Sequence, residues 1–350
     1  MVLVLFVSAL SICHRHRVVS GILVAEWDVG CGRAEWIHIG NNHVAYVSDA
    51  IGDRVRMFNL EGTFIGQWGA LGDQDGEFNT PSGIVTDPYR SEVFIADHKN
   101  NRIQVFQSLT ETESTLEFKS PNGETGNSGG NAGGNVGTFL RKIDNVCFPL
   151  GLALDHHEGQ LFVSSEGPPC EKGQIYIFST TNGAQLRCFS FGGSPHGLAF
   201  DPLRREVIVA NGMNLSAFAV SSQSVSMGCL PEWRTIGNAG IWWLVHVDFN
   251  CDQIFVTDSP VGRVVVCNRE GVATRDWQPR SYREQGCRGS AQKTRDQYCR
   301  ALAPNYLRPA PGNADREQTL KGISVKNGRV YVVASPRSTS STNARVLVFE

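Results

Sequence analysis

The strongest constraint on the fold is an internal repeat of paired apolar runs. In each copy an alternating run ends in Asp, a turn follows, and a second run ends ten residues after that Asp. Such alternation is typical of half-buried β-strands. The repeat therefore predicts a series of β-hairpins. The clearest copies are residues 83–97, 151–165, 197–211 and 244–258, and diverged copies are 36–49 and 321–335.

Each pair of runs is followed by further strand-like segments. The predicted third strands are 54–59, 102–107, 174–179, 215–220, 263–268 and 345–350. The predicted fourth strands, which are more irregular, are 63–69, 138–143, 184–190, 224–229 and 273–278. The repeating unit is thus a sheet of four antiparallel strands.

The repeat length identifies the architecture. Second strands end 46 to 48 residues apart, except for gaps of 68 and 77 that contain inserts at 108–136 and 281–316. Repeats of roughly 40–50 residues with four strands each indicate propeller blades. We therefore expect an all-β, six-bladed β-propeller spanning residues 21–350.

The N-terminal part of this domain supplies a missing strand. There are six third strands but five fourth strands after them, and residues 21–27 match 62–68. We expect this N-terminal strand to complete the last blade and close the ring, which removes exposed sheet edges.

Residues 1–20 precede the repeats and contain an uncharged apolar run at 2–13. A helix of this length spans about 18 Å, too short for a bilayer core of ~30 Å. The run suits a secretory signal peptide. We expect a secreted or secretory-pathway protein without a transmembrane span. The alternatives are that the run is a short membrane-associated anchor, or that the protein is cytoplasmic and the run forms an edge strand.

The repeats resemble NHL repeats. The resemblance is carried by FNTPSGIVTDPYRSEVFIADHKNNRIQVF at 78–106 and VSDAIGDRVRMFNLEGTFIGQWG at 47–69. It implies a propeller that binds protein or RNA, as in the tripartite-motif proteins. It extends more distantly to the peptide-amidating lyase propeller, whose zinc-binding histidines lie in Pro-His-Gly strands.

A metal site has little support in the sequence. Pro195-His196-Gly197 is the one Pro-His-Gly match, and Ser82, Leu150 and Lys321 occupy corresponding positions. Of the other histidines, His38 and His246 lie on predicted innermost strands, in a different register from His196. We expect no metal and no cofactor, and an enzyme with a metal in its channel is the alternative.

Three acidic residues stand five positions before an arginine, at the ends of predicted second strands. This spacing predicts an ion pair across the turn that fixes each loop. The pairs are Asp49–Arg54, Asp97–Arg102 and Asp258–Arg263. The aspartates at the opposite end of the hairpins, Asp87, Asp155, Asp201 and Asp248, suit turns.

The net charge of −2 argues against nucleic-acid binding by the whole surface, but one segment is basic. Residues 279–308 hold seven Lys and Arg against two acidic residues, with tyrosines interleaved. Such a segment suits phosphate contact and base stacking, although a solvated loop has the same composition. The candidate binding residues are Arg280, Tyr282, Arg283, Arg288, Lys293, Arg295, Tyr298 and Arg300.

Cysteines give a weaker signal. Cys287 and Cys299 share the basic segment and could form a disulfide in an oxidising compartment. Cys188 and Cys267 lie in predicted strands and are expected to be small buried hydrophobic residues.

Taken together, these features predict a non-catalytic interaction module that binds a protein or peptide on its top face, as a monomer. RNA binding through 280–308 and a lyase- or lactonase-like enzyme are the alternatives.

Overall fold

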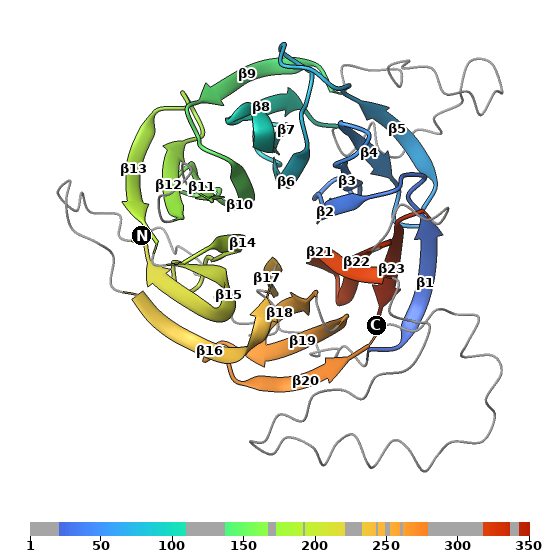
Figure 1. Ribbon diagram of the computed structural model, residues 1–350, viewed down its shortest axis with the longest axis vertical. Helices are drawn as coiled ribbons and strands as arrows, with labels where there is room; N and C mark the ends of the chain where they lie inside the picture. Colours follow the sequence, from blue (N-terminus) through green and yellow to red (C-terminus); the bar gives the residue numbers. More distant parts are fainter. Residues whose placement is uncertain are drawn as a thin grey trace, which may run out of the picture.

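The computed structural model describes residues 21–109, 137–166, 173–191, 193–220, 233–242, 244–248, 253–259, 262–278, 318–336 and 343–350. These residues form six antiparallel sheets arranged in a ring around a common axis (Figure 1). The predicted six-bladed β-propeller is thereby confirmed. Within the described ranges, no helix has the length and apolar character needed to cross a membrane. The apolar segment 1–20 and nearly all of both inserts lie outside the described residues.

Strand order in the blades follows chain order, with the first strand innermost. Blade one contains β2 (Ala34–Ile39), β3 (Ala45–Asp49), β4 (Arg54–Phe58) and β5 (Phe64–Trp68). Blade two contains β6 (Pro81–Asp87), β7 (Glu92–Asp97), β8 (Arg102–Gln107) and β9 (Phe139–Asp144), with the short 3₁₀ helix η1 (His98–Asn100) after β7. Blade three contains β10 (Pro149–Asp155), β11 (Gln160–Ser165), β12 (Gln174–Ser179) and β13 (Gln185–Ser190). Blade five contains β17 (Leu244–Asp248), β18 (Gln253–Asp258), β19 (Arg263–Asn268) and β20 (Ala273–Trp277).

Blade four differs in how its strands are connected. It contains β14 (Pro195–Asp201), β15 (Glu206–Ala219) and β16 (Trp233–Trp242). The amide of Val220 donates to the carbonyl of Arg205 over 2.7 Å, as the Ser108 amide does to Ser91 between strands two and three of blade two. We conclude that β15 folds back on itself and supplies both the second and the third strand.

The fourth strand of this blade was predicted at 224–229, and that prediction is wrong. Leu215 and Ala217 of β15 pair with Gly237 and Arg234 of β16, so residues 233–242 occupy the outer position. Pro231 lacks a backbone donor and suits the approach to a strand, whereas the aromatic and β-branched residues after it favour the strand itself. Residues 224–229 lie outside the described ranges.

The sixth blade joins the two ends of the chain. It contains β21 (Gln318–Lys326), β22 (Arg329–Pro336), β23 (Arg345–Phe349) and, on its outer edge, β1 (Leu23–Asp28). The amides of Ile22 and Glu350 donate to each other's carbonyl oxygens over 3.2 and 3.0 Å. The predicted closure by an N-terminal strand is confirmed.

A tryptophan–glycine contact repeats between neighbouring blades and explains the sequence match at closure. The indole of Trp27 in β1 covers Gly62, where a Cβ would lie 2.5 Å from the ring. In the same way Trp277 of blade five covers Gly21, where a Cβ would lie 2.8 Å from the indole ring. Both glycines have positive φ, so a side chain there would be strained as well as obstructed.

Of the two cysteines that were predicted to be buried, one lies on an inner strand and one on an outer strand. Cys267 of β19 is fully buried, and burial raises its pKa to about 12, so this thiol is inert at neutral pH. Cys188 is exposed, contrary to expectation, because β13 is the outermost strand of its blade.

Candidate functional site

The two faces of the ring carry different kinds of connection. We call the face with the turns between second and third strands the top face, and the opposite face the bottom face. Connections from one blade to the next also lie on the top face, because each fourth strand ends where the following first strand begins. The segment between β20 and β21, which contains all the predicted basic binding residues, therefore starts and ends at the top face. Those residues themselves, 280–300, lie outside the described residues.

The three Asp–Arg pairs form at the top face. Arg Nε donates to Asp Oδ2 over 2.9 Å in Asp49–Arg54, 2.8 Å in Asp97–Arg102 and 2.9 Å in Asp258–Arg263. Each carboxylate is almost fully buried. Such pairs belong to the framework that supports the top-face turns.

The pair in blade two is the most extensively bonded. The Asp97 carboxylate accepts from the backbone amide of Asn79 and from the side chains of Asn100, Arg102 and Gln104. Arg102 also donates to three carbonyl oxygens of the connection that precedes β6, those of Asp73, Gln74 and Glu77. Because these groups satisfy one another, the cluster holds the connection in place and leaves little capacity for a ligand.

The aspartates at the bottom face have two roles, of which the sequence showed one. In Asp87, Asp155 and Asp201 one carboxylate oxygen accepts from two amides of its own turn, as that of Asp155 does from His157 and Glu158. The side chain of Asp248 is not among those that the structure describes. The carboxylates of Asp87, Asp155 and Asp201 also face a basic side chain of the next blade. Arg205 lies 2.9 Å from Asp155, Arg269 lies 2.8 Å from Asp201, and His156 Nδ1 lies 3.9 Å from Asp87 Oδ1. These contacts between blades had no local sequence signal.

A polar ring surrounds the axis at the top face. Ala34, Pro81, Pro195 and Leu320 each pair with the end of the adjacent second strand. The residue after each therefore lies at the same level of the ring, one residue per blade. Pro149 of blade three pairs in the same way, so the apolar Leu150 also lies at this level. We call the polar members of this set, Glu35, Ser82, His196 and Lys321, the mouth residues.

The mouth residues interact across blade boundaries. Lys321 Nζ lies 3.3 Å from Glu35 Oε2, and the two side chains are 15% and 16% exposed. Arg33, in the connection between β1 and β2, also bonds to Glu35. Burial lowers the pKa of His196, so its imidazole is neutral at neutral pH, and Ser194 Oγ lies 3.3 Å from its Nε2. The mouth thus combines the carboxyl group of Glu35, the amino group of Lys321 and the neutral imidazole of His196.

Below the mouth, glycines allow neighbouring first strands to come close. A Cβ on Gly83 would overlap the carbonyl oxygen of Leu150, and one on Gly151 would overlap that of His196. A Cβ on Gly322 would likewise overlap the backbone of Trp36 and Ile37. Because strands that stand closer together make a smaller ring, the passage along the axis is narrow at this level.

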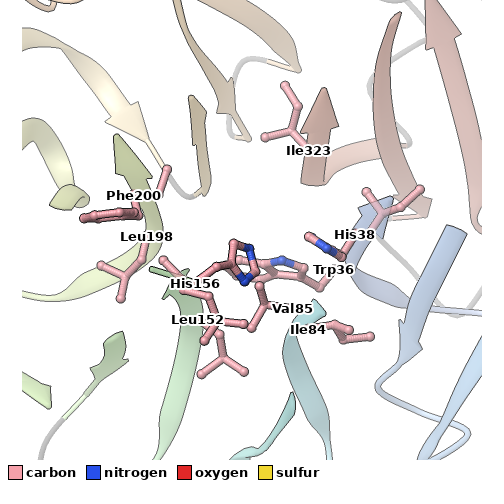
Figure 2. Close-up of a pocket in the computed structure, with 13 residues that line it drawn as sticks. Trp36, His38, Ile84, Val85, Leu152, His156, Leu198, Phe200 and Ile323 are labelled. Carbon is pink, nitrogen blue, oxygen red and sulfur yellow. The ribbon is translucent and has the colours of Figure 1, made fainter. Parts of the chain in front are cut away.

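An axial cavity of about 100 Å³ lies between the first strands. The described side chains that line it are aliphatic and aromatic, together with the imidazoles of His38 and His156, which Figure 2 shows turned toward the space between the strands. The side chains of β17, the innermost strand of blade five, are not among those that the structure describes. His38 Nε2 lies 3.0 Å from Thr86 Oγ1. The residues that line it come from β2, β6, β10, β14 and β21 and from the turn after β10: Trp36, Ile37, His38, Ile84, Val85, Leu152, Ala153, Leu154, His156, Leu198, Ala199, Phe200 and Ile323.

The histidines considered for a metal do not assemble within the described ranges. No group of three or more His, Cys, Asp or Glu side chains there could hold a metal ion. His196 belongs to the mouth, whereas His38 lies in the axial cavity on the other side of the glycines. The side chain of His246 is not among those that the structure describes.

Comparisons with known proteins identify the fold. No protein-family model matches the chain, and no curated protein matches it in sequence. A solved structure of a luciferin-regenerating enzyme matches with a TM-score of 0.59 at 9% identity, covering 93% of this chain and 94% of that one. A chain of a nidogen/laminin complex matches with a TM-score of 0.50 at 15% identity, covering 70% of this chain and 80% of that one. At such identities the similarity shows the propeller fold alone.

Proposed function

We propose that this propeller is a non-catalytic interaction module that binds a protein or peptide at its top face. The observation that carries the proposal is the ring of mouth residues. Four blades each present a chemically different side chain at one level of the axis. Rigid strands that hold varied polar groups around a common point are well suited to selective recognition.

The Glu35–Lys321 pair is the anchor in this proposal. Each side chain is largely buried but reachable, so a charged group of a partner can insert between them with little competition from water. Lys321 offers a site for a carboxylate, and Glu35 one for an amino or guanidinium group. An extended peptide carries both kinds of group within a few residues.

The resemblance to NHL repeats supports the same class of function, because those propellers bind proteins or RNA. The nidogen/laminin structure is a protein complex, although its similarity to this chain concerns fold. Neither source identifies a partner.

The proposal is tested by affinity capture from native cells with reversed charge at the mouth. The variant Lys321→Glu places two acids together and should abolish capture of the partner. The double variant Glu35→Lys with Lys321→Glu restores a pair and should recover part of the capture. Lys326→Glu is the matched control, because Lys326 lies at the bottom end of the same strand and bonds to Asn41. Equal capture by wild type and Lys321→Glu would contradict the proposal.

A second candidate function rests on the charge of residues 279–308, whose net charge is +5. We propose that any nucleic-acid binding by this chain depends on this segment. Changing Arg283, Arg288, Lys293 and Arg295 to Ala should weaken RNA binding. It should also flatten the slope of log affinity against log salt by roughly 0.7 for each phosphate that the variant no longer neutralises. Nuclease treatment before capture separates this function from protein binding, and an unchanged salt slope would contradict it.

A further inference from the structure

The axial cavity differs from the mouth in chemistry as well as in position. The mouth is charged, whereas the described part of the cavity wall is formed by Leu, Ile, Val, Ala, Phe and Trp side chains with two imidazoles. It lies on the bottom side of the level where Gly83, Gly151 and Gly322 bring the first strands together.

His156 lies at the boundary between the cavity and solvent. It belongs to the turn that joins β10 to β11 at the bottom face, and its side chain is 37% exposed while it also lines the cavity. The ring packs edge to face against Tyr89, with centroids 6.0 Å apart. This imidazole therefore borders both the cavity and the solvent at the bottom face.

The surroundings of His156 indicate which hydrogen bond it can offer. Its Nδ1 lies 3.9 Å from Asp87 Oδ1, a distance too long for a hydrogen bond. Burial lowers the pKa of His156, which keeps the imidazole neutral. A neutral imidazole has one nitrogen that accepts a hydrogen bond.

We propose that the axial cavity binds a small, uncharged, mainly hydrocarbon molecule with one hydroxyl group, which donates to the acceptor nitrogen of the His156 imidazole. Apolar walls favour hydrocarbon and exclude charge, since burying an unpaired ion is costly. An engineered apolar cavity of about 150 Å³ accepts benzene. A cavity of about 100 Å³ that has a partly exposed side chain in its wall therefore suits a single ring or a short branched chain.

The test is a ligand-observed NMR titration of the full chain with phenol, benzene and benzoate at neutral pH. Phenol should bind saturably, benzene more weakly by roughly three- to tenfold because it lacks the hydrogen bond, and benzoate not at all. An absence of saturable phenol binding, or binding of benzoate as tight as that of phenol, would overturn the proposal. The first result would mean that the cavity holds water only.

Two variants show whether binding occurs in this cavity. His156→Leu should remove the preference for phenol over benzene, whereas His157→Leu should keep it, because His157 is adjacent, 87% exposed and outside the cavity lining. Val85→Phe should reduce binding of both probes by filling the cavity. If Val85→Phe does not fold, the His156 and His157 pair still decides. Identical phenol preference in these two variants would refute the assignment.

Discussion

The top and bottom faces both contain buried aspartates, but they pair with cations in different ways. At the top face Asp and Arg are five residues apart in the same blade, as in Asp97–Arg102. At the bottom face Asp155 and Asp201 pair with an arginine of the next blade, 50 residues away for Asp155–Arg205, whereas Asp87 pairs with Arg90 of its own turn. Pairs of the first kind support one turn, whereas pairs of the second kind hold two blades together. Variants at the two faces can therefore show separately how stable a single blade is and how strongly neighbouring blades hold together.

The strongest test of this distinction removes the strand that closes the ring by joining the two ends of the chain in blade six. Deleting residues 1–28 eliminates β1 and leaves the β23 edge of blade six unpaired, so we expect aggregation or loss of the folded monomer. Size-exclusion chromatography with light scattering and a thermal melt measure the effect. Deleting residues 1–20 is the control and should leave the monomer intact. A stable monomer after the longer deletion would show that ring closure is dispensable.

Within the top face, the pair with the more buried arginine should contribute more to the free energy of unfolding. Asp97→Ala leaves Arg102, which is 5% exposed, without its carboxylate partner and should lower the free energy of unfolding by about 3–5 kcal/mol. Asp49→Ala releases Arg54, which is 23% exposed and can be hydrated, so the loss should be about 1–2 kcal/mol. Denaturant unfolding gives both values, and equal losses would refute the ranking.

At the bottom face, the arginines test the contacts between blades without removing the turn bonds of the aspartates. Arg269→Met leaves the buried Asp201 carboxylate without the arginine that lies 2.8 Å from it, and we expect a loss of about 2 kcal/mol. Arg205→Met removes a pair in which the arginine is 33% exposed, and the expected loss is about 1 kcal/mol. If neither variant is destabilised, these pairs contribute nothing to the cohesion of the ring.

The smallest expected effect is a dependence of stability on pH. Burial lowers the pKa of His156 and of His196, so between their folded values and the ordinary value of about 6.5 the unfolded chain binds more protons. Stability should therefore be level above that value and fall as the pH decreases through this window.

The denaturant midpoint at pH 7.5 and 5.5 measures this dependence, and replacing both histidines by Gln should reduce the difference. His157→Gln is the control because that side chain is solvent-exposed. An unchanged difference in the double variant would show that other groups cause it.

The amino-acid sequence determined the features that depend on neighbouring residues. Alternation of apolar residues defined most of the strands, and the repeat length defined six blades, because both patterns involve residues that are close together in the sequence. Even closure was visible, since residues 21–27 repeat the pattern of 62–68. Where a blade departs from the pattern, as at 233–242, the prediction was wrong.

Only the tertiary structure decided which distant groups meet around the axis. Glu35 and Lys321 are adjacent across the junction of blades one and six, although almost the whole chain separates them. The partner of Asp201 and the axial cavity between His38 and His156 likewise depend on how blades are placed around the closed ring. The physical reason is that each blade stabilises its own strands through local hydrogen bonds. The distances between side chains of different blades are set by the packing of all six.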